Sequence, residues 1–309
     1  MNKILSLLIG WGLDLLLGDP QRWPHPVVWF GKAISFCEHR LNKGNRRKLK
    51  GAIVSVTLSV AVFCITSLVR SMLSSLPYTV CVVFDSLVVF YCLAGTTLIR
   101  EVRQVFLAVD RSLAEGRRQV ARIVGRDTNE LSAQEVRTAA LETLAENLSD
   151  GVVAPLFWLA VLGPAGMLTY KMVNTLDSMI GYRTERFRDF GCVAAHIDDA
   201  ANYLPARLTA LLMIVAAGRI DLLRFVRLYG PRHASPNSGY PEAALAGILG
   251  CRFGGPHYYF GQLFEKPFIG HHDRKLTTTD MQCAISVNRK AELLMVTIVI
   301  LSWVLVSII

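Results

Sequence analysis

Long apolar runs constrain the fold of this chain more than any other feature of its sequence. Residues 51–69 carry no charge, residues 79–99 carry only Asp85, and residues 293–309 are again uncharged. Each run is close to the ~20 residues that a membrane-spanning helix needs. We therefore predict an all-α, multi-pass membrane protein, folded as a single domain over residues 1–309, with spans near residues 51–69, 79–99 and 293–309.

Basic residues beside these runs predict how the chain is oriented in the membrane. Residues 42–50 contain five Lys and Arg side chains and residues 100–126 contain seven Arg, whereas the connector at residues 71–78 has no charge. By the positive-inside rule the basic flanks are cytoplasmic and the connector is outside. Because topology accounts for most of the basic residues, the net charge of +9 does not indicate a nucleic-acid partner.

Three further apolar runs are ambiguous: residues 1–18, 152–170 and 204–218. We expect the first to be a retained helix. The second is interrupted by Pro155, Gly163 and Pro164, which is typical of a re-entrant or broken helix that lines a cavity. We favour a model in which the second and third runs form such a pair and keep the polar motifs and cytoplasmic helical loops on one face. Two full crossings remain the alternative.

An acidic pattern follows a predicted helix start. Ser132 and Glu135 have the spacing of a capping box. On the helix that they would open, Glu142, Glu146 and Asp150 recur every four residues and share one face if the helix reaches Asp150. Like charges at this spacing destabilise a helix unless a cation neutralises them. Mg²⁺ is one candidate, because it prefers carboxylate oxygens, and a solvated acidic face is the alternative.

Lys171, Asn174 and Asp177 follow the broken run at intervals of three, along one stripe of a helix. A Lys side chain can meet a phosphate, and Asn and Asp can hold a metal ion or orient a nucleophile. Capping of a helix end beside a snorkelling Lys explains the same pattern, and the spacing does not separate the two interpretations.

Arginines and acids surround this stripe. Arg183, Arg186 and Arg207 offer guanidinium groups suited to phosphate or carboxylate, while Asp198 and Asp199 form an acidic turn. Local ion pairing between the two kinds of side chain is the alternative to a binding site.

Two loop motifs complete the candidate set. Ser235, Asn237 and Ser238 lie in a turn before an Ala-rich helix, where hydroxyl groups and backbone amides suit a phosphate. His25 lies in a Pro-rich elbow together with Asp19, although a single His is more often structural. The sequence has no Gly-x-x-x-x-Gly-Lys-Ser/Thr motif, which excludes a standard P-loop nucleotide site.

Five motifs carry a family resemblance. They are, in chain order, GDPQRWPHPV from Gly18, ENLSDGVVAPLFW from Glu146, YKMVNTLDSMIGYRTERFRDFG from Tyr170, DDAANYLPARL from Asp198 and SPNSGYPEAALAG from Ser235. Together they closely resemble the adenosylcobinamide-phosphate synthase family of cobalamin biosynthesis, called CbiB or CobD, and they extend along nearly the whole chain.

The resemblance implies a multi-pass enzyme of the bacterial inner membrane whose active site faces the cytoplasm. The implied reaction is an ATP-dependent ligation that joins (R)-1-aminopropan-2-ol O-phosphate to adenosylcobyric acid through an amide bond. ATP is the implied co-substrate and Mg²⁺ the implied cofactor. The implied partners are the corrinoid, the amino alcohol phosphate, the lipid bilayer and other cobalamin-assembly enzymes.

The resemblance and the residue chemistry together give a role to each candidate. We expect Mg²⁺ to be held by Glu142, Glu146, Asp150 and Asp177. We expect catalysis from Lys171, Asn174, Asp198 and Asp199, with one of the two aspartates accepting the proton of the amine. The remaining candidates would bind the phosphates and the substrates: His25, Arg183, Arg186, Arg207, Ser235, Asn237 and Ser238.

Two other functions are weighed against this ligase. One is a non-catalytic, AmpE-like membrane sensor. The retained acids and bases argue against it. The other is a transporter for an anionic or corrinoid solute, since broken helices and buried charges also mark transport paths. The small number of full spans and the absence of paired halves argue against transport.

Overall fold

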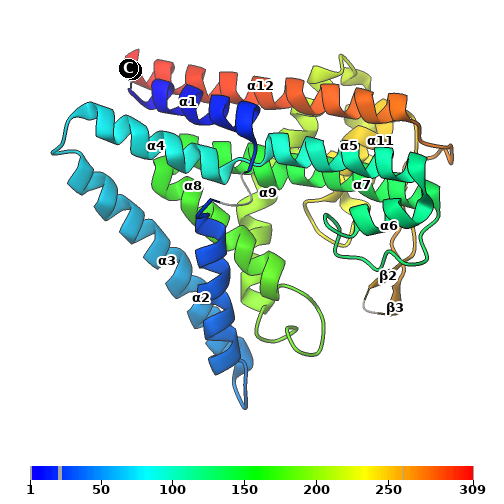
Figure 1. The fold of residues 1–309 in the computed structure, drawn as a ribbon, viewed down its shortest axis with the longest axis horizontal. Coiled ribbons are helices and arrows are strands. Elements are labelled where there is room, and N and C mark those ends of the chain that lie inside the picture. Colours follow the sequence, from blue (N-terminus) through cyan, green and yellow to red (C-terminus); the bar gives the residue numbers. More distant parts are fainter. Residues whose placement is uncertain (1, 20–22, 260, 309) are drawn as a thin grey trace. The chain divides into compact units, whose positions relative to one another are not determined.

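The computed structural model describes residues 2–19, 23–259 and 261–308, and they are predominantly helical (Figure 1). This confirms the predicted all-α class. The described chain divides into two compact units, each built from separate stretches of sequence. The first unit contains residues 1–94, 154–202 and 299–309, and the second contains residues 95–153 and 203–298. A single functional domain over residues 1–309 stays a prediction.

The first unit is built almost entirely from long helices. They are α1 (Asn2–Leu17), α2 (Pro26–Leu41), α3 (Arg47–Leu73), α4 (Tyr78–Cys92) and α8 (Ala154–Ile180), together with the first part of α9 (Cys192–Ala216) and the end of α12 (Thr278–Ile308).

Among its described residues, the second unit contains shorter helices and two small antiparallel sheets of two strands each. Its helices are α5 (Gly95–Arg111), α6 (Leu113–Val120), α7 (Ala133–Leu148), the π-helical turn η1 (Ser149–Val153), η2 (Ile220–Leu222), α10 (Leu223–Tyr229), η3 (Gly230–Arg232) and α11 (Gly239–Leu249). Strand β1 (Phe253–Gly254) pairs with β4 (Phe268–Ile269), and β2 (His257–Tyr259) pairs with β3 (Gln262–Phe264).

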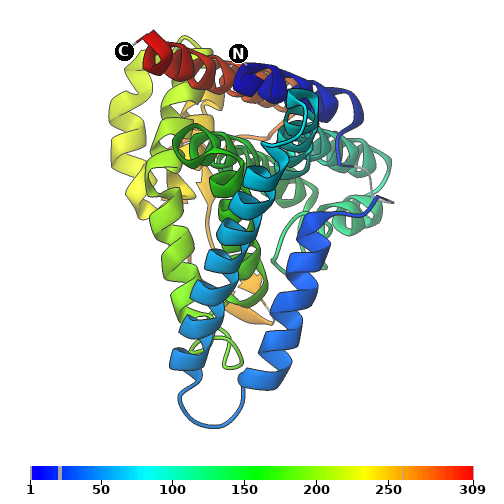
Figure 2. The same ribbon diagram turned by 90° about the vertical axis from the view of Figure 1, so that its left-hand side faces the viewer.

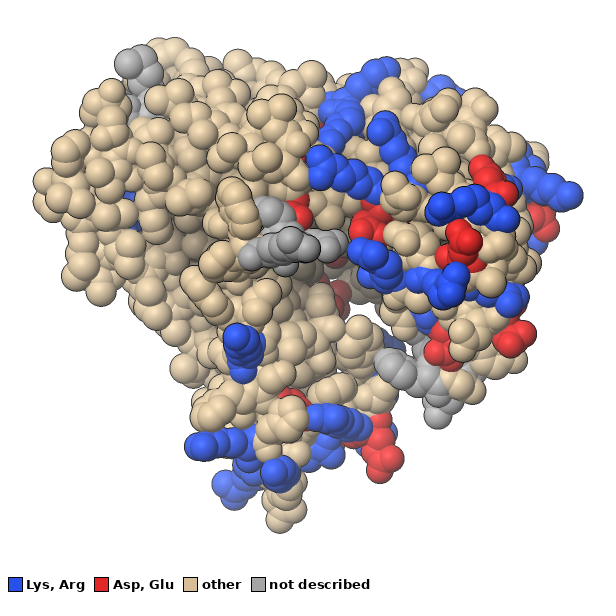
Figure 3. Space-filling view, in the orientation of Figure 1, with Lys and Arg blue, Asp and Glu red and all other residues tan. Residues whose placement is uncertain are grey.

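Within the described residues, four helical segments are long and apolar enough to cross a membrane: Arg47–Leu73, Tyr78–Arg111, Ala133–Ile180 and Thr278–Ile308. The predicted runs lie inside three of them, apart from Ile309, which is outside the described residues. Figure 3 agrees with a lipid-facing surface in the first unit, because charged side chains gather around the α2–α3 turn and the visible surface of α3 and α4 is nearly free of them.

Two of the apolar runs are broken. The run at residues 79–99 is not one continuous helix, because α4 ends at Cys92 and Leu93 adopts an extended conformation (φ −87°, ψ 145°) before α5 begins at Gly95. In α8, Gly163 has a non-helical conformation (φ 69°, ψ −162°) immediately before Pro164. The break at Gly163 confirms the broken helix that the Pro and Gly residues predict.

Close backbone packing holds the first unit together. A buried cluster joins Ile34 of α2, Val54 of α3, Leu176 of α8 and Phe190 of the loop before α9. Helices α2 and α3 converge on the short turn that joins them (Figure 2). A Cβ atom on Gly51 would collide with the carbonyl oxygen of Phe190, so only glycine lets α3 approach this loop.

Helix α7 forms the core of the second unit. Every residue from Ala139 to Ala145 is buried, which includes the acidic Glu142. The predicted capping box opens this helix, because Ser132 Oγ accepts from the Glu135 amide while the Glu135 carboxylate accepts from the Ser132 amide. The helix stops at Leu148, however, so Asp150 lies in the π-helical turn η1 and does not continue the predicted α-helical face.

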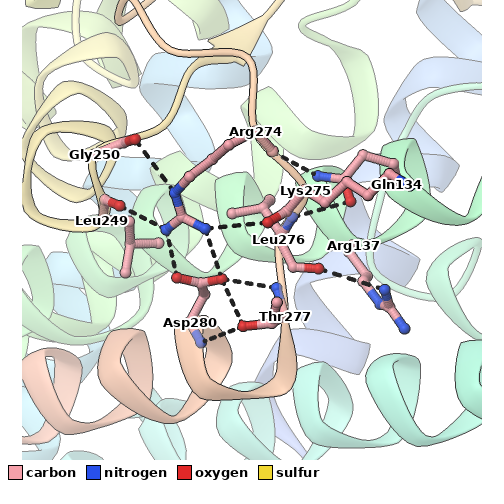
Figure 4. A network of polar contacts seen from close by, with 9 residues as sticks. All are labelled: Gln134, Arg137, Leu249, Gly250, Arg274, Lys275, Leu276, Thr277 and Asp280. Carbon is pink, nitrogen blue, oxygen red and sulfur yellow. Dashed lines mark hydrogen bonds and ion pairs between the residues drawn. The ribbon is translucent and has the colours of Figure 1, made fainter.

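Arg274 fixes the start of α12 in the second unit (Figure 4). Its guanidinium donates to both carboxylate oxygens of Asp280, at 2.5 and 3.0 Å, and to the main-chain oxygen of Leu249 at 2.6 Å. The carboxylate of Asp280 also accepts from the Thr277 amide at 2.7 Å, which caps the helix. One arginine therefore ties the end of α11 to the first turn of α12.

Candidate functional site

A buried carboxylate occupies the centre of the acidic cluster in the first unit. Asp198 of α9 is 8% exposed, and its Oδ2 accepts from the Asn202 side chain at 3.1 Å. Asn202 in turn accepts from the hydroxyl group of Tyr170 at 2.9 Å, which fixes its orientation. The other oxygen of Asp198, Oδ1, is buried and has no hydrogen bond of standard geometry from the described residues, although the Asn174 side chain lies close enough to act on this carboxylate. Burial therefore leaves this oxygen without the hydrogen bonds that a carboxylate usually accepts.

The surroundings of Asp198 disfavour its charged form and so raise its pKa. Burial raises the pKa of Asp198 to about 7, and the negative charge of the nearby Asp177 adds to the effect, while the hydrogen bond from Asn202 opposes it. Burial also raises the pKa of Asp199, where His196 and Arg183 oppose the effect. A carboxyl group that titrates near neutral pH is suited to exchange a proton with a substrate.

The predicted stripe on α8 passes from this carboxylate to a cavity. The charge of Asp177 raises the pKa of Asp198, and the side chain of Asn174 lowers it. Lys171, nearer the start of the helix, lines a cavity of about 270 Å³. Asp19 and His25 line the same cavity. The first unit thus holds two groups of candidates. One is His25 and Lys171 in the cavity, and the other is Asn174, Asp177, Arg183, Asp198 and Asp199 around the buried carboxylate.

His25 has a clear structural role. Its Nδ1 accepts from the Val27 amide at 3.2 Å and caps α2, while its Nε2 lies 3.4 Å from the carboxylate of Asp19. Burial lowers the pKa of His25, the charge of Lys171 lowers it further, and Asp19 raises it. A role for His25 in anion binding stays a prediction, whereas Lys171 provides the positive charge in the cavity.

Arg186 has a partner that local sequence patterns do not reveal. It donates to both oxygens of Glu38, at 3.0 and 2.8 Å, although the two residues are 148 positions apart. The hydrogen bond from Arg186 is the main cause of a lowered pKa at Glu38. Arg186 therefore fastens the loop before α9 to the end of α2, and the ion-pairing alternative describes it better than a phosphate-binding role.

In the second unit Glu142 is part of a buried ion pair. One oxygen accepts from Arg126 Nη2 at 2.5 Å and the other from the Gly254 amide at 2.7 Å. The side chains of Arg126 and Glu142 are only 8% and 3% exposed, which rules out the solvated acidic face for this residue. Glu142 links α7 to Arg126 and to strand β1.

The hydroxyl motif of the second unit is also internally bonded. Ser235 Oγ accepts from the amides of Asn237 and Ser238, at 3.2 and 3.4 Å, and Ser238 Oγ donates to Glu146 at 2.8 Å. Arg207 donates to the side-chain oxygen of Asn237 at 2.9 Å. The structure therefore brings Glu146, Arg207, Ser235, Asn237 and Ser238 together, as a pre-formed loop.

Two charged or titratable residues near this loop, His233 and Glu242, were not predicted from the sequence as site residues. Glu242 is 4% exposed, and His233 Nε2 lies 3.7 Å from its carboxylate. Burial raises the pKa of Glu242 well above its ordinary value, and the charges of Glu142 and Glu146 add to the effect. Glu242 reads in the sequence as an ordinary first-turn residue of α11, and only its burial distinguishes it.

The described residues offer no ready-made metal centre. Among residues 2–19, 23–259 and 261–308, no group of three or more His, Cys, Asp and Glu side chains is arranged to hold a metal ion. Both oxygens of Glu142 already accept hydrogen bonds, so this residue does not fit the predicted role of a ligand. The buried Oδ1 of Asp198 beside the charge of Asp177 fits a single cationic group, such as an ammonium.

Comparison with known proteins identifies the family. A family model described as CobD/Cbib protein matches residues 7–288. The cobalamin biosynthesis protein CbiB of Salmonella arizonae is 39% identical over 293 residues, which cover 91% of this chain and 92% of that protein. This chain belongs to the CobD/CbiB family. The cobalamin biosynthesis proteins CobD of Streptococcus sanguinis (39% identical, 92% of each chain) and of Clostridium perfringens (36% identical, 90% of this chain and 91% of the relative) are also similar.

Membership of the CobD/CbiB family supports a role in cobalamin biosynthesis. The match includes all the site residues described above, because it extends over residues 7–288. No solved structure matches the chain. The convergence of the two polar clusters into one pocket stays a prediction.

Proposed function

We propose that this CobD/CbiB protein is an adenosylcobinamide-phosphate synthase of the bacterial inner membrane. It would use ATP to join the amine of (R)-1-aminopropan-2-ol O-phosphate to a carboxylate of adenosylcobyric acid. The observation that carries the proposal is the family match over residues 7–288, together with relatives whose names place them in cobalamin biosynthesis. The chemistry of Asp198 supports an acid-amine ligation in particular.

The proposed reaction has two steps, phosphorylation of the carboxylate and attack by the amine. A carboxylate oxygen of the corrinoid attacks the γ-phosphate of ATP, which gives an acyl phosphate and releases ADP. The neutral amine then attacks the acyl carbon, inorganic phosphate leaves, and the amine nitrogen loses a proton. Mg²⁺ would enter this reaction as part of the ATP complex and offset the phosphate charge.

Asp198 is suited to prepare the amine. At physiological pH the amino alcohol is an ammonium ion, which cannot act as a nucleophile until it loses a proton. The charge of Asp177 attracts this cation, and the buried Oδ1 of Asp198 can accept the proton. A pKa of about 7 makes the ionised carboxylate accessible and still basic enough for the transfer.

A cavity in the same unit as Asp198 supplies a positive charge, Lys171, beside Asp19 and His25. Lys171 lines it and lies on the same stripe of α8 as Asp177. We assign Lys171 to the phosphate group of the amino alcohol, which would leave the ammonium end toward Asp177 and Asp198. An amine and a phosphate on one small molecule would thus meet opposite charges along a single helix.

The test is an assay on the full chain, purified in detergent or reconstituted in vesicles. Adenosylcobyric acid, aminopropanol phosphate and MgATP should yield the amide product by mass spectrometry, with one ADP released per product. Asp198→Asn should lower the rate at least ~100-fold, the size typical of a lost general base. Asp221→Asn, which changes an exposed carboxylate paired with Arg219, is the matched control and should leave the rate unchanged.

Three results would refute the proposal. They are the absence of product from active, folded protein, product formation that does not need ATP, and ATP-dependent uptake of the corrinoid into vesicles without a covalent change. The last result would favour a transporter.

A further inference from the structure

A second cavity lies in the first unit and is lined by none of the residues used in the proposed reaction. It has a volume of about 400 Å³. Its charged lining residues are Lys3 of α1, Arg70 of α3 and Asp85 of α4. Asp85 lies in the middle of α4, and an ionisable residue within the spanning part of a membrane protein usually pairs with another charge or serves a ligand or a transport path.

The charges of this cavity do not balance. Arg70 donates through Nε to both oxygens of Asp85, at 2.9 and 3.0 Å, so that these two side chains neutralise each other. Lys3 is exposed on its helix, and its charge also acts on Asp85, but it comes within ion-pair distance of no carboxylate of the described residues. The cavity therefore carries one excess positive charge, which suits an anionic ligand.

The rest of the lining suits a lipid. Leu7, Val89, Leu159 and Trp303 provide an apolar wall, which continues into the exposed side chains of Val161 and Leu162. The break in α8 at Gly163 also lines the cavity, and the carbonyl groups at a helix end lack intrahelical partners and can accept from hydroxyl groups. The lining thus combines acceptors, one cation and an apolar wall.

The position of the cavity along the helices matches the headgroup region of a bilayer. Lys3 lies in the first turn of α1, Arg70 in the last turn of α3, and Trp303 in the last turns of α12. Trp side chains and the ends of spanning helices are characteristic of the membrane interface. The uncharged connector that follows Arg70 puts this end of α3 outside the cytoplasm by the positive-inside rule.

We propose that this cavity binds the headgroup of an anionic phospholipid with free hydroxyl groups, of the phosphatidylglycerol type, in the outer leaflet. The phosphate meets Lys3, the glycerol hydroxyls donate to the carbonyl groups at the break in α8, and the acyl chains follow the apolar wall. The inference is independent of the ligase reaction, because it involves neither the Asp198 cluster nor the Lys171 cavity.

The test is native mass spectrometry of the detergent-purified full chain titrated with phosphatidylglycerol, phosphatidylcholine or soluble glycerol 3-phosphate. Phosphatidylglycerol should bind with the highest affinity. Lys3→Gln should weaken its binding about fivefold, as expected for one interfacial basic residue worth ~1 kcal/mol. Lys3→Arg, which keeps the charge, should retain binding.

Lys48→Gln is the matched control, because it removes an exposed lysine at the opposite end of α3. It should leave the affinity unchanged. Equal affinity for phosphatidylcholine, or unchanged binding of phosphatidylglycerol to Lys3→Gln, would overturn the proposal. Glycerol 3-phosphate that binds as tightly as the lipid would also overturn it, because it would point to a soluble phosphate ligand.

Discussion

Asp198→Asn should stabilise the protein at alkaline pH while it removes the proposed reaction. The folded environment raises the pKa of Asp198 from its ordinary 3.8 to about 7. At ~1.4 kcal/mol per pKa unit this difference corresponds to about 4 kcal/mol. Because the folded-state pKa is raised, the uncharged carboxyl stabilises the fold below pH 3.8, and this contribution is lost as the pH rises to about 7.

The comparison of wild type and variant isolates this effect. Asparagine keeps the shape and the hydrogen bonding to Asn202 but never acquires the charge, so the variant should be the more stable protein by up to about 4 kcal/mol at pH 8. The advantage should shrink toward zero near pH 4. Denaturant unfolding of the detergent-solubilised protein across this range measures the difference.

Asp199→Asn provides the control, because Asp199 is only partly buried and should give a smaller gain. A difference between wild type and Asp198→Asn that stays constant with pH would refute the reasoning. So would a variant that is less stable than the wild type at pH 8. Either result would mean that the folded protein does not disfavour the charged form of Asp198.

Three further variants test separate parts of the account. Arg126→Ala should cost about 3–5 kcal/mol of unfolding free energy, because it leaves Glu142 buried without its partner; unchanged stability would contradict the structural role of this pair. Arg186→Ala should lower the free energy of unfolding far less than Arg126→Ala, because Arg186 is 59% exposed and solvent screens its ion pair. Its effect should be present above pH 4.5 and lost as the pH falls through the lowered pKa of Glu38, and a pH-independent effect would count against the ion pair. Lys171→Ala should raise the KM for aminopropanol phosphate about tenfold or more in steady-state assays, while an unchanged KM would remove Lys171 from the phosphate site.

Local patterns in the sequence predicted the local features of the fold. The spacing of Ser132 and Glu135 predicted the start of α7, and Gly163 with Pro164 predicted the break in α8, because capping and helix breaking depend on residues a few positions apart. The same reasoning failed at Leu93. An apolar run carries no information on a one-residue change to extended backbone, so residues 79–99 read as one helix.

Contacts between distant segments could not be predicted in the same way. Arg126 reads as one more basic residue beside a membrane span, and nothing in its neighbourhood indicates Glu142 as its partner. Likewise, Glu38 and Arg186 are 148 positions apart. The acidic pattern of α7 was recognised, but whether its first member faces water, a metal ion or an arginine depends on tertiary packing.

The candidate site shows the same division. The sequence identified Asp198 and Asp177 as acidic residues near a membrane span, and the motifs that contain them both resemble the CobD/CbiB family. Only the structure shows that Asp198 is buried with one oxygen unbonded among the described residues. An Asp-Asp pair in a sequence is a weakly specific signal, and this buried oxygen makes Asp198 the better candidate for the proton acceptor.

Oxygen transfer from the corrinoid to phosphate tests the central claim most directly. Adenosylcobyric acid labelled with ¹⁸O in its free carboxylate is incubated with the protein, aminopropanol phosphate and MgATP, and the inorganic phosphate is analysed by mass spectrometry. Carboxylate activation by ATP followed by amine attack predicts one ¹⁸O atom in the phosphate for each amide formed. Inorganic phosphate without the label, alongside normal amide formation, would contradict the account.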